Sequence, residues 1–151
     1  MNHEKNMDPV IWTPEAETLF VWLLFTEYEQ GMMFGSNFRT VTWDSIHDRL
    51  KVHDNRFGDY SIMDLKKKYL RIRGTWKGCH DLQMRTCGFS WNYETHSLQS
   101  NDALWAAHLV AFPGDSRLRN AKLYHYDWLT EMFLPPPQII DADVDFDSSG
   151  D

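Results

Sequence analysis

The residues best suited to bind a ligand form a basic run in the middle of the chain. Residues 64–76, DLKKKYLRIRGTW, hold five cationic side chains in thirteen positions, although the 151-residue chain has a formal net charge of −7. Cationic side chains at this density can contact phosphate groups. The same run can also be the solvated face of an ordinary helix. Which reading applies depends on where these side chains point.

The charge of the chain is unevenly distributed along the sequence. Residues 60–87 contain seven basic and two acidic residues, a net charge of +5, and the rest of the chain therefore carries −12. A basic segment inside an acidic frame points to a charged partner. The basic segment favours a polyanion, whereas the acidic remainder favours a basic protein. Both alternatives remain open at this stage.

The basic run has helical periodicity. At about 100° per residue, an apolar stripe forms from Leu65, Tyr69, Ile72 and Trp76. The rest of the helix circumference carries the candidate phosphate contacts, which are Lys66, Lys67, Lys68, Arg71, Arg73 and Lys77. The pattern therefore predicts an amphipathic, cationic helix with one buried side.

The sequence predicts where this helix begins but not where it ends. Ser61 followed three residues later by Asp64 has the arrangement of a capping box, which predicts a start near Ser61. Gly74 and Gly78 each cost a helix roughly 1 kcal/mol relative to Ala. The helix can therefore continue, bend or end at these glycines.

Two earlier segments are also predicted to be helical. Thr13 as N-cap and Pro14 at the first helical position predict a helix that runs to about Gly31. Its segment FVWLLF, residues 20–25, is apolar on every side, so more than one neighbouring element must cover it. A second helix is predicted with Thr42 as its cap, and residues 53–58 then form a loop.

The C-terminal third is predicted to contain two more helices. Residues 87–98 have the composition of an ordered loop or short hairpin. Ser100 or Asn101 then caps a helix that ends at Pro113, and a last helix spans residues 124–133 before three consecutive prolines.

The composition predicts a single globular domain with an aromatic core. The chain has seven Trp, nine Phe and six Tyr, and 151 residues are enough to bury a core. The expected core residues are Trp12, Trp43, Ile46, Leu65, Tyr69, Trp76, Trp91, Trp105 and Trp128. Residues 1–11 are expected to be a flexible N-terminus, and residues 134–151, with five Asp and no base, an acidic disordered tail.

The sequence offers little support for catalysis or a bound cofactor. Cys79 and Cys87 lie eight positions apart, not in a C-x₂-C pair, and are expected to be reduced thiols without a metal. We find no Gly-rich phosphate loop, nucleophile elbow or pair of catalytic carboxylates. No apolar run approaches the roughly 18 residues that a membrane span needs. We therefore expect a soluble intracellular protein that is not an enzyme and has no cofactor, small-molecule substrate or membrane partner.

Several ordered motifs along the chain resemble one known family. The segment Trp12-Thr13-Pro14-Glu15 is followed by Phe38, then by Trp43 and Ile46, and then by Leu65-Lys66 at the start of the basic helix. These residues are similar to the Myb/SANT-like DNA-binding family of plants and fungi. The resemblance continues through Cys87-Gly88-Phe89-Ser90-Trp91-Asn92, Asp102, Leu104-Trp105, Pro113 and the segment from Tyr126 to Phe133. It covers roughly residues 12–133.

This resemblance implies an all-α fold. Residues 12–86 would form a Myb/SANT-type three-helix bundle in which helices two and three make a helix-turn-helix variant. Residues 87–133, a loop and two helices, would extend it as a C-terminal helical subdomain. The resemblance also implies a nuclear protein that regulates transcription or is related to the accessory proteins of Harbinger-type transposons.

The resemblance and the charge pattern together imply two functions. In the first, the basic third helix enters the major groove of double-stranded DNA, with Lys67 and Arg71 opposite the apolar stripe and Arg71 best suited to a bidentate guanine contact. In the alternative, a SANT-type module binds a basic protein partner, such as a histone tail, a transposase-like protein or a chromatin-complex subunit.

Overall fold

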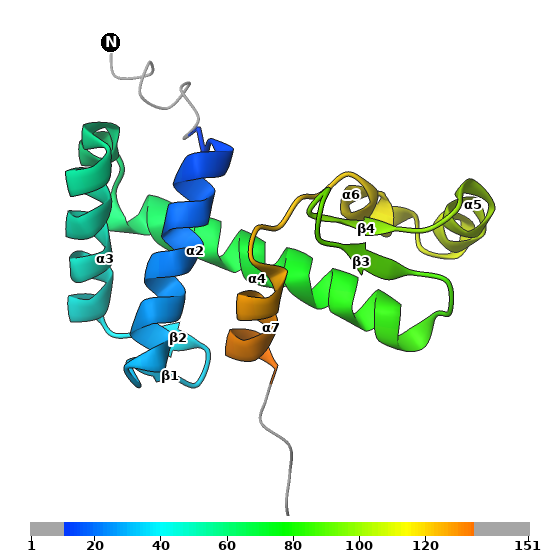
Figure 1. Ribbon diagram of the computed structural model, residues 1–151, viewed down its shortest axis with the longest axis horizontal. Helices are drawn as coiled ribbons and strands as arrows, with labels where there is room; N and C mark the ends of the chain where they lie inside the picture. Colours follow the sequence, from blue (N-terminus) through cyan, green and yellow to red (C-terminus); the bar gives the residue numbers. More distant parts are fainter. Residues whose placement is uncertain (1–10, 135–151) are drawn as a thin grey trace, which may run out of the picture.

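The structure is a computed structural model that describes residues 11–134. It is mostly helical, with two short antiparallel hairpins (Figure 1). In chain order the elements are α2 (Pro14–Glu29), β1 (Met33–Phe34), β2 (Asn37–Phe38), α3 (Thr40–His53), the 3₁₀ helix η1 (Asn55–Asp59), α4 (Ile62–Arg85), β3 (Ser90–Asn92), β4 (Ser97–Gln99), α5 (Asp102–Ala111), the 3₁₀ helix η2 (Pro113–Asp115), α6 (Ser116–Arg119) and α7 (Tyr126–Phe133). The predicted flexible N-terminus and acidic tail lie outside the described residues, except for their innermost positions.

The first helix begins where the sequence predicts. The Oγ1 atom of Thr13 accepts a hydrogen bond from the backbone N–H of Ala16 at 3.1 Å, and Pro14 occupies the first helical position. α3 and α7 both pack against this helix, which covers most of its apolar segment. Trp22 is the exception, because its side chain remains 42% exposed.

The predicted start of the second helix is wrong by three residues, because the cap is Arg39 and not Thr42. α3 begins at Thr40, directly after the β1–β2 hairpin, in which Met33 pairs with Phe38. Thr42 is not a cap, because its own N–H already donates to the carbonyl of Arg39 at 3.0 Å and its side chain is buried. Local helical hydrogen bonding therefore begins before the residue whose type suggested a cap.

The predicted loop after α3 is instead a turn of 3₁₀ helix. The Oδ1 atom of Asp54 accepts a hydrogen bond from the backbone N–H of Arg56 at 3.0 Å, which caps η1. The ring of Phe57 is buried within this turn and lies 5.3 Å from the ring of Trp12. The short connection between α3 and α4 is thus fixed by a cap and by a core contact.

α4 is the longest helix and continues through both glycines. Its 24 residues make it roughly 36 Å long. The capping box is present, because Ser61 Oγ accepts from the N–H of Asp64 and the Asp64 carboxylate accepts from the N–H of Ser61. In Figure 1, α4 runs along the long axis of the molecule, with α2 and α3 at its first half and the β3–β4 hairpin and α6 at its second half.

The C-terminal third contains one α-helix and one 3₁₀ helix more than the sequence predicts. Asn101 caps α5, and its Oδ1 atom accepts from the N–H of Leu104 at 2.8 Å. Residues 87–98 include the predicted hairpin, in which Trp91 pairs with Leu98. The short helix α6 is not predicted. The last helix begins at Tyr126 instead of residue 124, because His125 adopts a left-handed backbone conformation with φ 57°.

The core is continuous between the two halves of the chain and is mostly aromatic. Trp43 is fully buried, and its ring lies 5.7 Å from that of Phe38 and 5.5 Å from that of Tyr69. α7 joins this core, because the ring of Phe133 lies 5.8 Å from Tyr69. Of the expected core residues, the buried ones are Trp43, Ile46, Leu65, Tyr69, Trp76 and Trp105, and those partly buried against the core are Trp12, Trp91 and Trp128.

Candidate nucleic-acid interface

The outer face of α4 is cationic. Its buried stripe of Leu65, Tyr69, Ile72 and Trp76 is continued by Cys79 and Leu82, which fixes the side of the helix that faces the core. On the opposite side Lys67 and Arg71 are exposed, and Lys66 and Arg73 flank them as half-buried residues. Within residues 11–134, no carboxylate lies within ion-pair distance of these four basic side chains. Their charge is available to a ligand.

Lys68 has a different position from the other candidate contacts. Its Nζ atom lies 2.7 Å from Oε1 of Glu17 on α2, and the two side chains are only 11% and 10% exposed. The ammonium group also lies 5.6 Å from the centre of the Trp12 ring. The structure therefore places Lys68 in the packing between α2 and α4, and away from the outer face.

Lys77 lies on the outer side of α4 but already has a partner. Its Nζ atom is 3.0 Å from Oδ2 of Asp81, one turn later on the same helix. Exposed pairs of this kind contribute about 0.3–0.5 kcal/mol. A stronger anion can therefore displace Asp81, but Lys77 begins with its charge partly balanced.

Sequence reasoning missed two apolar residues on the same face. Met63 and Leu70 are each 58% exposed and lie seven residues apart, so they share the outer face with Lys67 and Arg71. Apolar side chains beside basic ones can contact thymine methyl groups in a major groove. The helical projection already placed both residues opposite the buried stripe, so a signal for them was present.

Sequence reasoning also missed a basic residue from another element. Arg117 of α6 lies over α4, where its Nη2 atom comes within 3.4 Å of the position that a Cβ atom on Gly78 would occupy. Nothing in the sequence pointed to it, because a four-residue helix has too little periodicity to be recognised.

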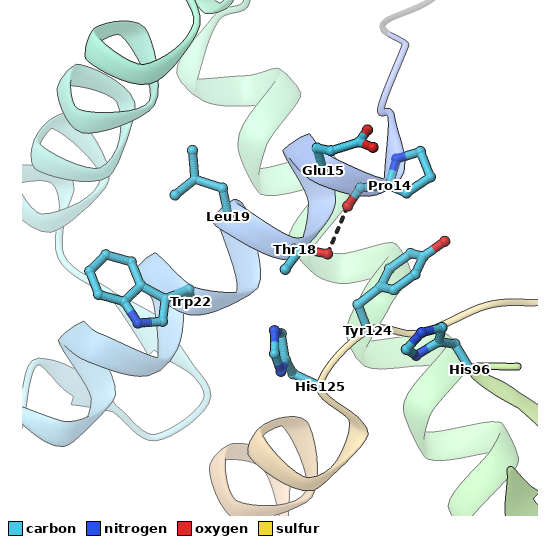
Figure 2. Close-up of a pocket in the computed structure, with 8 residues that line it drawn as sticks. All are labelled: Pro14, Glu15, Thr18, Leu19, Trp22, His96, Tyr124 and His125. Carbon is cyan, nitrogen blue, oxygen red and sulfur yellow. Dashed lines mark hydrogen bonds between the residues drawn. The ribbon is translucent and has the colours of Figure 1, made fainter. Parts of the chain in front are cut away.

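A second surface of interest is a pocket of about 620 Å³ that shares no residue with the outer face of α4. Figure 2 shows its lining residues, which are Pro14, Glu15, Thr18, Leu19, Trp22, His96, Tyr124 and His125. They come from α2 and from the segments next to β4 and α7. Most of the exposed lining is apolar, and Glu15 supplies its acidic group.

Two histidines of this pocket have unusual backbone conformations. His96 and His125 both have φ 57°, and within residues 11–134 they are the non-glycine residues with positive φ. The ring of His125 stacks on Trp128 at 3.8 Å, and the ring of His96 lies 4.7 Å from that of Tyr124. Burial lowers the pKa of His125 and raises the pKa of Tyr124. Left-handed residues of this kind concentrate at functional sites.

The described residues contain no group of three His, Cys, Asp or Glu side chains placed to hold a metal ion. Cys79 is buried and Cys87 is exposed, and neither forms a disulfide. Burial raises the pKa of the Cys79 thiol to about 12, so Cys79 is a packing residue at neutral pH. In the same part of the chain, no helix combines the length and apolar character needed to cross a membrane.

The domain is mostly helical, and its longest helix presents a cationic face. Helical DNA-binding domains typically have such a face. The family model described as the Myb/SANT-like DNA-binding domain matches residues 11–108, which is more than half of the chain. The chain belongs to this family, which confirms the resemblance to Myb/SANT-like DNA-binding domains over these residues, and the membership suggests a DNA-binding role. The family is typically non-enzymatic. Comparisons with curated proteins and with solved structures found no match.

Proposed function

We propose that the chain is a nuclear DNA-binding module of a transcriptional or transposon-derived regulator, and that α4 enters the major groove of double-stranded DNA. The observation that carries this proposal is the division of α4 into two sides. Its apolar stripe is held in the core, whereas Lys67 and Arg71 on the opposite side are exposed and have no ion-pair partner within residues 11–134.

The arrangement of the first helices supports a Myb-type bundle. α2, α3 and α4 share the core around Trp43, and the five-residue η1 connects α3 to α4 as the turn of a helix-turn-helix variant. Residues 87–133 would then be a C-terminal extension of the same domain, which spans residues 12–133. The contact between Trp128 of α7 and Phe25 of α2, with ring centres 5.1 Å apart, favours this unit because it joins the extension to the bundle.

The side chains of α4 would have different roles in the groove. Lys66 and Arg73 flank the outer face and suit phosphate contacts that position the helix. Arg71 can donate two hydrogen bonds to O6 and N7 of guanine, which makes it the best specificity residue. The exposed Met63 and Leu70 can pack against thymine methyl groups.

Fluorescence anisotropy with a labelled duplex across a salt series tests this function. Wild-type affinity should fall with salt. Replacing both Lys67 and Arg71 by Gln should weaken binding and reduce the log–log slope by about 1 for each phosphate contact that is lost. The matched control replaces Arg119 and Lys122 by Gln. This control removes the same charge from side chains that contact Asp102 and the carbonyl of Thr95. Absence of binding at low salt, or equal loss in both variants, would contradict the proposal.

A SANT-type protein-interaction module is the second candidate, and the pocket on α2 favours it. Trp22 is 42% exposed at this pocket, and the neighbouring Glu15 would pair with a basic residue of the partner. The fitting partners are those with a basic segment, such as a histone tail, a transposase-like protein or a chromatin-complex subunit. Titration of a basic histone-tail peptide, monitored by Trp fluorescence and repeated with Trp22→Ala, tests this candidate. Binding by wild type that Trp22→Ala abolishes supports it, and absence of binding by wild type contradicts it.

A further inference from the structure

A small pocket between α4 and α6 brings together two arginines from distant parts of the chain. The pocket has a volume of about 420 Å³ and is lined by Leu70, Arg71, Gly74, Thr75, Arg117 and Ala121. None of these lining residues carries a carboxylate. Arg71 and Arg117 are thus the charged residues of this lining, and both are positive.

The glycines of α4 explain how Arg117 reaches this surface. A Cβ atom on Gly78 would lie 3.0 and 3.1 Å from the two Cδ atoms of Leu118. Leu118 is 1% exposed, so α6 is anchored directly against the backbone of α4 at Gly78. Arg117 precedes Leu118 and therefore lies on the surface of α4 beside this anchor.

Gly74 has the opposite surroundings. Nothing lies within 4 Å of the position that its Cβ atom would occupy, although it forms part of the pocket. A helix position without a side chain lets the backbone of a ligand approach the helix closely. The floor of the pocket is therefore open to a ligand at Gly74.

Arg117 adds a positive charge to the outer face of α4 beside Gly74 and Gly78, where the helix itself has no side chain. Residues 67, 71, 74 and 78 follow one face of the helix at i, i+4, i+7 and i+11. Lys67 and Arg71 supply charge at the first two positions, and Arg117 supplies it where Gly74 and Gly78 cannot. Figure 1 shows α6 at the second half of α4, as this continuation requires.

The charge of Arg117 is not balanced by a neighbour. Within residues 11–134, Arg117 forms no ion pair, whereas Arg119 on the same short helix binds Asp102 at 2.7 Å. The carboxylate of Asp115, two residues before Arg117, is held by His108 at 2.8 Å. Arg117 is thus the basic residue of α6 without an ion-pair partner in the described part of the chain, and its charge is available to an added anion.

We propose that Arg117 binds one phosphodiester group of the DNA backbone at the pocket over Gly74, next to Arg71, whose guanidinium group stays free to contact the base edge. The inference rests on the proposed function, because it requires α4 to lie on DNA. A guanidinium group suits a phosphate, since it can donate two hydrogen bonds in one plane to the phosphate oxygens. The contact brings α6 into the DNA interface, although α6 lies beyond the residues that the family model matches.

Anisotropy measurements on the full chain, with one duplex and a salt series, test this contact. Arg117→Gln should weaken binding and lower the log–log salt slope by about 1, the change expected for one lost phosphate contact. Arg117→Lys should keep the slope and recover only part of the affinity, because it keeps the charge but loses the planar pair of donors. The matched control is Arg119→Gln, which removes the same charge from the same helix and should leave the slope unchanged. Circular dichroism melting of each variant checks that the fold is retained.

The outcomes separate this inference from the proposed function. If the Lys67 and Arg71 double variant loses binding but Arg117→Gln keeps the wild-type slope, α4 binds DNA and the contact at Arg117 is wrong. If Arg117→Gln and Arg119→Gln weaken binding equally, the effect is one of net charge and the contact is also wrong. If wild type binds no duplex at low salt, the proposed function fails and the inference fails with it.

Discussion

The Nζ atom of Lys68 on α4 lies 2.7 Å from Oε1 of Glu17 on α2, and the two side chains are about equally shielded from solvent, at 11% and 10% exposure. Three consecutive lysines of α4 therefore differ in their surroundings. Lys67 is exposed, Lys66 is half-buried, and Lys68 connects two helices of the core. The helix turns by about 100° per residue, so adjacent residues of one type face different environments.

Lys68→Ala should destabilise the domain far more than Lys67→Ala. Removing one partner of a shielded ion pair leaves the other charge unpaired, which costs on the order of 3 kcal/mol. An exposed substitution away from such a pair usually changes the free energy of unfolding by less than about 0.5 kcal/mol. Urea denaturation of both variants measures the difference. Equal stability of the two variants would show that the Lys68–Glu17 pair contributes nothing.

The two glycines of α4 should respond differently to Ala. Gly74→Ala adds a methyl group in open space and should stabilise the helix by up to about 1 kcal/mol. Gly78→Ala adds a methyl group within about 3 Å of the buried Leu118, and such overpacking typically costs about 1–3 kcal/mol. The melting temperature of Gly74→Ala should therefore be higher than that of wild type, and that of Gly78→Ala should be lower than that of Gly74→Ala. The reverse order would mean that α6 does not pack on α4 at Gly78.

Trp43→Ala should remove much of the stability of the domain. Trp43 is fully buried among Phe20, Phe38 and Tyr69, and truncating a buried aromatic costs about 3–5 kcal/mol. Trp22→Ala is the matched control. The side chain of Trp22 is 42% exposed, so its removal should lower the free energy of unfolding much less. Melting temperatures that fall equally in the two variants would place Trp43 outside the core.

The two cysteines should react at very different rates in the native protein. Cys87 is exposed, whereas Cys79 is buried and its thiol has a pKa raised to about 12 by burial. The thiolate is the reactive form, so at pH 8 a thiol reagent should modify one sulfur quickly and the second only after unfolding. Cys87→Ser should abolish the fast phase. Two fast equivalents in the native wild type would contradict the burial of Cys79.

The sequence predicts features that local interactions determine and misses features that depend on distant contacts. The stripe of α4 and its capping box arise within about one to four turns of helix, so Leu65, Tyr69 and Ser61 were placed correctly. The partner of Lys68 is Glu17, 51 positions earlier in the chain, and periodicity carries no information about such a pair. α6 was missed for a related reason. Its four residues are anchored by Leu118 against Gly78 and not by a pattern of their own.

The same distinction applies to the candidate site. The helical projection was enough to place Lys67 and Arg71 opposite the apolar stripe. From the sequence, Gly74 and Gly78 could be seen only as residues that destabilise the helix. Their role becomes visible in the structure, where α6 packs against α4 at Gly78 and the surface at Gly74 stays open. A glycine in a cationic helix is therefore informative only when the element that approaches it is known.

The stability of the domain should fall in mild acid in part because of His125. Burial lowers the pKa of His125 below its ordinary value of 6.5, so the unfolded chain binds a proton at this residue more readily than the folded chain. The contribution is present above about pH 6.5 and is lost as the pH falls through the lowered folded pKa.

His125→Asn should flatten this pH dependence and keep the fold, because Asn tolerates the left-handed conformation with φ 57°. Melting temperatures at pH 7.5 and 5.5 should therefore differ less in this variant than in wild type. His96→Asn makes the same replacement at the same φ. Because His96 contributes less than burial to the lowered pKa of His125, this variant should flatten the pH dependence less than His125→Asn does. If the difference in melting temperature between the two pH values is the same in His125→Asn as in wild type, His125 titrates alike in the folded and unfolded chain. Its imidazole would then be solvated beside Trp128 and not shielded by it.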